Sequence, residues 1–237
     1  MENGSEIEYD LSELKKSTLA KFGQSKSLTI EEELIKKEEK KLRKLQNVKN
    51  KEKNLCKKFN DYNGLFREEL QKKQSIISFD LEFWEKKTSI VLEIGFTVLD
   101  TKTMKMVSKN LVITDYLDKV NGIYVPDNKY NFMFGETLFL KKKDAWELFY
   151  AQLDKADLYL GHSLHNDLAK LEKQYMHKKY YDTTKMFDYY ANGFDSIVNL
   201  EKISNACELN PQYLHNAGND AYYTMKCALA ITKKIAA

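Results

Sequence analysis

Hydrophobic and polar residues alternate in three consecutive segments near the middle of the chain, which predicts three neighbouring β-strands. The apolar segments cover residues 76–83, 90–99 and 106–113. Thr101, Lys102 and Thr103 separate the second from the third and predict a tight turn. Short connections favour antiparallel neighbours, so these segments predict an antiparallel three-strand meander.

Downstream of the meander, helical spacing alternates with short apolar runs. Helices are expected to begin at Asp144 and Ser163 as caps and at Ser196, and a last helix to cover about residues 218–235. Short strands are expected at residues 158–160 and near 184–187. This order predicts an α/β fold, a mixed sheet flanked by helices. Residues 116–135 have no period and predict a long loop, of the kind that is usually functional or disordered.

The first 73 residues differ from the rest, which predicts an N-terminal extension, residues 1–73, ahead of the α/β domain, residues 74–237. Residues 31–60 hold eleven Lys or Arg and six Glu, with weak apolar spacing that predicts one long helix or two. The first 25 or so residues are polar and expected to be mobile. The helix is either a solvated arm or an arm that binds nucleic acid or a protein partner, and its mixed charge favours the former.

Composition limits the class of protein. Hydrophobic residues make up 43% of the 237 residues, enough for a sizeable core, and the net charge is +3. The three cysteines are far apart and form no CxxC pair, which predicts a reducing compartment and no structural zinc site. We find no apolar run of about 20 residues and no secretory signal, so we expect an intracellular protein, cytoplasmic or nuclear, without a membrane partner.

Two acidic residues interrupt the first predicted strand. Asp80 and Glu82 are two positions apart, so their side chains share one face of the sheet. Two negative charges within an apolar strand are costly unless a cation compensates them. An exposed edge strand is the alternative, but the apolar flanks favour a central strand. The pair therefore predicts a divalent metal site.

Two later segments add further candidate ligands. Asp167 follows a buried strand and lies in a polar cluster with His162 and Asn166, a typical position for a site, although alone it could complement a helix dipole. His215 and Asp220 flank small residues just before the last helix. Four carboxylates and one imidazole together suit divalent metal binding with a general base.

These segments resemble the three motifs of the DEDDh (DnaQ-like) 3′→5′ exonuclease family, whose fold is ribonuclease H-like. FDLE at 79–82 resembles the first motif, GHSLHNDL at 161–168 the second, and HNAGND at 215–220 matches HxAxxD, the third. Asn216 stands where the tyrosine branch of the family would need Tyr. The similarity covers about residues 75–235. The segment HNAGNDAYYT also resembles the corresponding segment of a fungal branch of ribonuclease H-like proteins, some of them linked to RNA silencing or mRNA export.

The resemblance implies a hydrolase with a two-metal mechanism that uses Mg²⁺ or Mn²⁺ at the free 3′ end of single-stranded nucleic acid, with RNA slightly favoured over DNA. Asp80 would bridge both ions, and Glu82 and Asp220 would complete the site that positions the attacking water. Asp167 would support the second ion. His215 would accept the proton of the water, as a general base.

Substrate contacts are expected close to the motifs. Phe83 follows the DxE directly and could stack on a terminal base, with core packing as the alternative. Leu81, His162 and Asn166 are the other expected substrate-binding residues. Aromatic residues of the long loop are expected to form another wall of the groove: Tyr124, Tyr130, Phe132 and Phe134.

Two rival functions fit parts of the same pattern. A catalytically silent module that binds nucleic acid or protein would keep the fold, but it would not need all five residues. A ribonuclease H-like endonuclease can share clustered carboxylates, but the HxAxxD spacing favours an exonuclease.

Overall fold

The computed structural model describes residues 27–72 and 74–234, which form parts of two compact units, residues 1–54 and 55–237. One continuous helix, α2 (Ser27–Gln71), has residues in both, so of the two expected alternatives, one long helix or two, the structure shows the first. Its side chains from residue 32 to 54 are mostly exposed, with Ile35 and Leu42 half-buried. The two units divide between residues 54 and 55, whereas composition had suggested a boundary after residue 73. The N-terminal segment expected to be mobile lies outside the described residues.

Six strands form one mixed sheet in the order β4-β3-β2-β1-β5-β6. The expected meander is confirmed, because β1 pairs antiparallel with β2 and β2 with β3. Its strands are β1 (Ser75–Trp84), β2 (Lys87–Asp100) and β3 (Lys105–Ile113). Beside β1, β5 (Leu158–Gly161) and β6 (Tyr180–Asp182) run parallel to it.

Two strand predictions need correction. The strand β4 (Gly135–Leu140) was not expected; it pairs parallel with β3 at the edge of the sheet. The strand expected near residues 184–187 was wrong, because β6 ends at Asp182 and Thr183–Met186 form the short helix α5. The unexpected β4 shortens the long loop, which covers residues 117–134 after the 3₁₀ turn η1 (Thr114–Tyr116).

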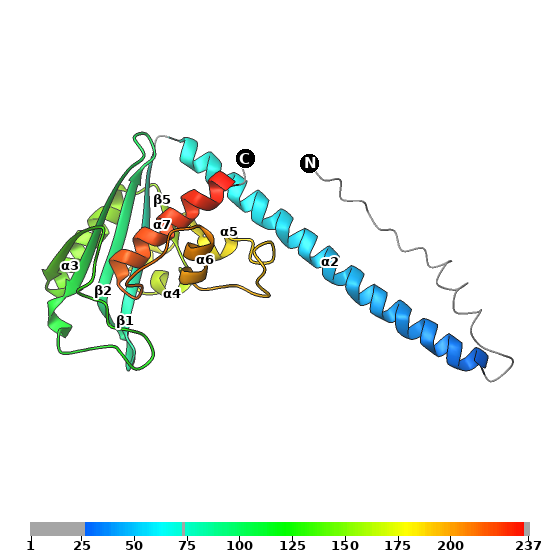
Figure 1. Cartoon of the computed structure of the whole chain (residues 1–237). Coiled ribbons are helices and arrows are strands. Elements are labelled where there is room, and N and C mark those ends of the chain that lie inside the picture. The colour runs from blue at the N-terminus through cyan, green and yellow to red at the C-terminus, as the bar shows by residue number, and fades with distance from the viewer. Residues whose placement is uncertain (1–26, 73, 235–237) are drawn as a thin grey trace. The chain divides into compact units, whose positions relative to one another are not determined.

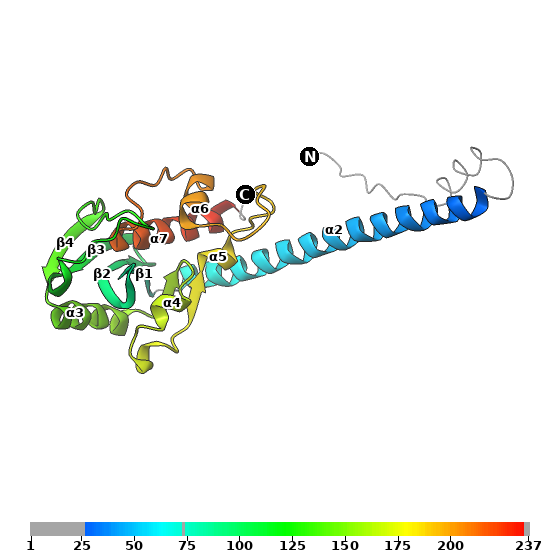
Figure 2. The same ribbon diagram turned by 90° about the horizontal axis from the view of Figure 1, so that it is seen from below.

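Helices cover both faces of the sheet. The helix α3 (Lys142–Lys155) lies on one face, and α7 (Ala217–Lys234) with α6 (Leu200–Ala206) lies on the other (Figures 1 and 2). On the α3 side, Phe79 packs edge-on against Phe149 and Tyr159, with ring centroids 5.4 and 5.5 Å away. Burial of such rings stabilises the fold by about 1.5–3 kcal/mol each. Within the described part of the chain, no helix is both long and apolar enough to span a bilayer.

The last turns of α2 belong to the core of the second unit. Phe59 and Phe66 are buried, and the ring of Phe66 lies 5.0 Å from that of Tyr181 on β6. Asn63 Nδ2 donates a 2.7 Å hydrogen bond to the carbonyl of Met186. The end of the helical extension is therefore a structural part of the α/β unit.

The two helix caps and the helix start at Ser196 that were expected from the sequence are wrong, because other residues lie at these helix starts. At the start of α3, the backbone N–H of Lys142 donates to Asp115 rather than to Asp144. Asn199, not Ser196, caps α6. Ser163 has a left-handed backbone (φ 55°) and caps nothing; the helix that follows is the single turn α4 (His165–Leu168). A second 3₁₀ turn, η2 (Lys173–Tyr175), leads to β6.

Candidate active site

Strand β1 directs Asp80 and Glu82 toward α7. Ser78, two residues before Asp80, shows which face this is: its hydroxyl donates to the carbonyl of Ala221 on α7 at 2.6 Å. Phe79 lies in the core on the α3 side. Because side chains alternate along a strand, the two carboxylates share the face covered by α7.

A glycine on β2 allows the start of α7 to lie against the sheet. Gly95 pairs with Asp80 across the strands. A Cβ at Gly95 would lie 1.9 Å from the carbonyl carbon of Ala217 and 2.2 Å from the nitrogen of Gly218. Only glycine fits there, and its small size brings the segment from His215 to the start of α7 next to β1.

His215 and Asp220 are held together by the backbone. His215 has a left-handed backbone (φ 62°), and its N–H donates to Asp220 Oδ2 at 3.1 Å. The imidazole Nδ1 lies 3.9 Å from Glu82 Oε1. One potential ligand atom from each of Glu82, His215 and Asp220 lies within 4.8 Å of the others. Asn216 caps α7, since its Oδ1 accepts the N–H of Asn219 at 3.0 Å.

Asp167 approaches the same place from α4. It is 5% exposed, and its Oδ1 accepts the N–H of Leu81 on β1 at 3.1 Å. The turn before α4 is fixed by Asp182 at the end of β6, whose carboxylate accepts the N–H groups of Ser163 and Leu164 at 3.1 and 3.0 Å. Asp182 therefore positions Asp167, a role that the sequence did not indicate.

The carboxylates are electrostatically costly without a cation. Burial raises the pKa of Asp80 to about 7. Burial and the nearby charge of Asp80 raise the pKa of Asp167 to about 8. Burial and repulsion from neighbouring carboxylates also raise the pKa of Glu82 and Asp220 well above the usual range. Asp220 Oδ1 is buried and has no hydrogen-bond partner in the described residues. An oxygen-rich set with an unsatisfied buried oxygen fits Mg²⁺ or Mn²⁺.

A further buried carboxylate, Glu93, lies directly opposite Glu82 on β2. It is 3% exposed and accepts hydrogen bonds from Asn110 at 2.9 Å and Asn216 at 3.2 Å. Burial raises its pKa to about 7. We did not predict this residue, although a single charge in the apolar run IVLEIGF was a signal for it.

The long loop, residues 117–134, is fastened to the same region by asparagines. Asn219 accepts the N–H of Met133 and donates to the carbonyl of Asn131, both at 3.0 Å. Asn128 donates to the carbonyl of Leu214 at 2.6 Å. Aromatic loop residues do not form the expected wall as a group. The ring of Phe134 stacks on that of Tyr222 of α7, with ring centroids 3.7 Å apart, and Phe132 lies against Gly218. Tyr130 stacks on Phe139 of β4, whereas Tyr124 is 81% exposed.

The residues expected to bind substrate lie on β1 and at or just before α4. Leu81 is buried, and Phe83 packs against the same core on the α3 side, with Lys170 Nζ 5.3 Å from its ring centroid. His162 Nδ1 lies 2.9 Å from the hydroxyl of Thr183, and burial lowers the pKa of its imidazole. Asn166 is exposed on α4. Their roles in substrate binding stay predictions.

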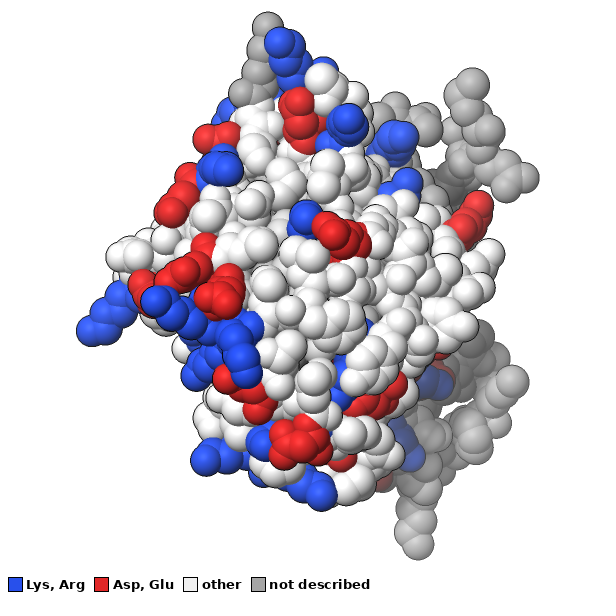
Figure 3. All heavy atoms as spheres, turned by 90° about the vertical axis from the view of Figure 1, so that its left-hand side faces the viewer, with Lys and Arg blue, Asp and Glu red and all other residues white. Residues whose placement is uncertain are grey.

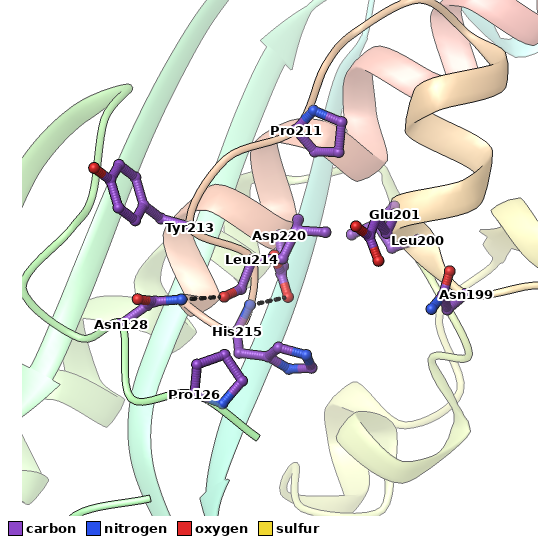
Figure 4. Close-up of a pocket in the computed structure, with 10 residues that line it drawn as sticks. All are labelled: Pro126, Asn128, Asn199, Leu200, Glu201, Pro211, Tyr213, Leu214, His215 and Asp220. Carbon is purple, nitrogen blue, oxygen red and sulfur yellow. Dashed lines mark hydrogen bonds between the residues drawn. The ribbon is translucent and has the colours of Figure 1, made fainter. Parts of the chain in front are cut away.

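A pocket of about 440 Å³ opens beside the cluster (Figure 4). His215 and Asp220 form part of its lining, and Asn199 and Glu201 from the start of α6 face them across it. Pro126 from the long loop lines the same pocket. The candidate ligands therefore border a space large enough for a small ligand.

Comparison with known proteins agrees with the motifs. Residues 75–231 match the DEDDh_C family, described as DNA polymerase III subunit epsilon-like, C-terminal domain. Among solved structures, cell-death related nuclease 4 (CRN-4) is similar with a TM-score of 0.45 and 14% identity, over 69% of this chain and 64% of that one.

Curated relatives come from two yeasts, in line with the fungal resemblance. Uncharacterized protein YDR514C of Saccharomyces cerevisiae is 28% identical over 65% of this chain and 40% of its own length. Uncharacterized nucleolar protein C2C4.08 of Schizosaccharomyces pombe is 26% identical over 68% and 70%. Good for full DBP5 activity protein 2 of Saccharomyces cerevisiae is 25% identical over 62% and 33%. The chain thus spans 40% and 33% of the lengths of the two Saccharomyces relatives.

Proposed function

Since the chain belongs to the DEDDh family, DNA polymerase III subunit epsilon-like, we propose that it is a metal-dependent 3′→5′ exonuclease that hydrolyses single-stranded nucleic acid from its 3′ end. The observation that carries the proposal is the cluster of Glu82, His215 and Asp220 at the buried, unpartnered Asp220 Oδ1, with Asp167 held on the N–H of Leu81, between Asp80 and Glu82 on β1. A purely structural role would leave that oxygen hydrogen-bonded.

Asp80, Glu82, Asp167 and Asp220 would hold two Mg²⁺ or Mn²⁺ ions. Bound ions of this kind neutralise the scissile phosphate, activate water and stabilise the leaving oxygen. The chain contributes the geometry: β1 fixes Asp80 and Glu82 on one face, and the Leu81 N–H fixes Asp167. Residues locked in this way need little rearrangement on binding, which favours catalysis.

His215 would act as the general base. Its side chain is 45% exposed, so water and substrate can reach the ring. Burial lowers the pKa of the imidazole, although the charge of Glu201 opposes this effect. The ring is therefore neutral near pH 7 and can accept a proton. General base catalysis contributes about 10²–10⁴-fold, so loss of Asp80 should impair hydrolysis more than loss of His215.

We take a short single-stranded 3′ end as the proposed substrate, in line with the charge pattern on one face of the molecule. On the face that carries the edge strand β4, acidic and basic side chains are interspersed around a largely uncharged centre (Figure 3). Such a face lacks the one-sided positive charge that a long duplex would use. The Lys-rich part of α2 that precedes residue 55 is a further candidate contact for nucleic acid or a protein partner. The similarity to the nucleolar protein C2C4.08 of Schizosaccharomyces pombe supports a nuclear location.

The test is the decay of a 3′-labelled oligonucleotide with Mg²⁺ or Mn²⁺, for the full chain and for Asp80→Ala. We expect decay with the wild-type protein and its loss in the variant. Equal decay with both proteins would refute the proposal. Binding without decay by the wild-type protein would instead support the silent binding module.

A further inference from the structure

The pocket beside the carboxylate cluster has the size and lining of a site for one nucleoside. Its volume of about 440 Å³ lies in the range of small-ligand sites, about 300–1,000 Å³. Pro126 and Pro211 give it apolar walls, while the ring of Tyr213 points away from the other lining residues (Figure 4). Flat apolar walls suit a base, while polar groups at the other positions suit a sugar.

Two polar side chains at the start of α6 have unused hydrogen-bonding capacity. The carboxylate of Glu201 lines the pocket and, among the described residues, has no hydrogen bond or ion pair. Asn199 uses its Oδ1 to accept the N–H of Lys202 at 3.0 Å, which leaves its Nδ2 group as a donor. Glu201 and His215 line the same pocket, so a ligand there can reach both.

The chemistry of a carboxylate selects which part of a nucleotide faces it. An ionised carboxylate only accepts hydrogen bonds, and its two oxygens can take two hydroxyl donors at once. A ribose carries adjacent 2′ and 3′ hydroxyls, whereas a deoxyribose carries only the 3′ hydroxyl. A phosphate would be repelled by Glu201. A nucleotide in the pocket would therefore lie with its 5′-phosphate toward Asp80, Glu82 and Asp220 and its sugar toward α6.

We propose that this pocket holds the 3′-terminal ribonucleoside of the substrate and that Glu201 accepts hydrogen bonds from its 2′ and 3′ hydroxyls, so that the protein prefers RNA ends. This inference rests on the proposed function. It adds a specificity-determining residue that lies outside the five motif residues.

The test compares two oligonucleotides that differ only in the sugar of the last nucleotide, ribose or deoxyribose. kcat/KM for removal of that nucleotide is measured with the full chain, Glu201→Ala and Glu201→Gln. Glu208→Gln is the matched control, because Glu208 is exposed just beyond α6 and outside the pocket. The midpoint of thermal unfolding is measured for every variant to verify that it folds. Replacement of an exposed side chain should leave this midpoint unchanged.

We expect the wild-type protein to prefer the ribose end, and Glu201→Ala to reduce that preference about tenfold, the effect of one hydrogen bond to a charged group. Removal of the deoxyribose nucleotide should fall by about tenfold, because that end loses only the hydrogen bond to its 3′ hydroxyl, and Glu208→Gln should behave as wild type. An equal fall for both ends would show that Glu201 acts through His215 and would overturn the inference, as would an unchanged preference.

Binding of the product separates this inference from the proposed function. Adenosine 5′-monophosphate should stabilise the wild-type chain against heat in the presence of Mg²⁺ more than its 2′-deoxy analogue does, and Glu201→Ala should abolish the difference. If the wild-type protein degrades neither oligonucleotide, the proposed function fails, and the comparison of the two monophosphates still decides whether the pocket reads ribose. Equal stabilisation by both would overturn the inference.

Discussion

Removal of one buried charge should stabilise the metal-free protein, which is the opposite of what most core substitutions do. Asp80→Asn keeps the shape of the side chain and removes its charge. A pKa of about 7, against 3.8 for the free side chain, corresponds to a penalty of about 4 kcal/mol on the ionised form. The amide still has to be desolvated, at about 1–3 kcal/mol. We therefore expect a net gain of about 1–3 kcal/mol in the free energy of unfolding near pH 8.

The gain depends on pH in a direction set by the raised pKa. Well below pH 3.8 the carboxyl of Asp80 is protonated in both the folded and the unfolded chain, so it costs nothing. As pH rises from 3.8 to about 7, the unfolded chain loses the proton first, and the folded state loses stability. Asp167, with a pKa raised to about 8, extends this loss to slightly higher pH. The advantage of Asp80→Asn should therefore be absent in acid and complete above about pH 8.

The assay is urea unfolding of the wild-type chain, Asp80→Asn and Asp61→Asn, in chelator, at several pH values between about 4 and 8. Asp61 is an exposed aspartate on α2 and serves as the control for charge removal. Addition of Mn²⁺ at high pH should stabilise the wild-type chain by about 2.7 kcal/mol at a hundred times Kd, and the variant by less. A variant that is less stable than wild type in chelator at pH 8, or a wild-type stability that rises with pH, would refute the reasoning.

Three further predictions concern the geometry of the site. Gly95→Ala should destabilise the fold by about 3 kcal/mol or more, because its Cβ would overlap the backbone of Ala217. Gly64→Ala, in open space on α2, should instead stabilise the fold by about 0.5–1 kcal/mol. Urea unfolding of both variants measures these changes. Asp182→Ala should cost about 2–3 kcal/mol and lower kcat, because the turn before α4 loses its acceptor; wild-type kcat in the folded variant would contradict it. His215→Ala should lower kcat about 10²–10⁴-fold. In the wild type the rate should fall as pH drops through a pKa below 6.5, and the variant should lack this acidic limb of the pH–rate profile. A limb retained in the variant would assign the base elsewhere.

The central strands and the last helix were predictable because their patterns reflect burial directly. The strands β1, β2 and β3 are covered on at least one face by helices, so apolar residues mark them clearly. Asp80 and Glu82 were conspicuous for the same reason, since charges interrupt an apolar run only at a cost. Order and spacing of the motifs then linked them to Asp167, His215 and Asp220, none of which stands out alone.

The errors arose where a distant residue decides the local structure. The edge strand β4 has mostly exposed or half-buried side chains, so its sequence GETLFL has little pattern, and pairing with β3 defines it. The start of α3 and the turn before α4 take their acceptors from Asp115 and Asp182, which no local motif reveals. Glu201 could not be assigned to the pocket from the sequence, because only the packing of α6 against α7 brings it there.

The most direct test of the central claim uses one strand in two forms, linear and circular, with the full chain and Mg²⁺ or Mn²⁺. The account predicts that the linear strand is shortened one nucleotide at a time from its 3′ end with release of nucleoside 5′-monophosphates, that the circle stays intact, and that Asp80→Ala degrades neither. Cleavage of the circle, or release of internal fragments from the linear strand, would contradict it.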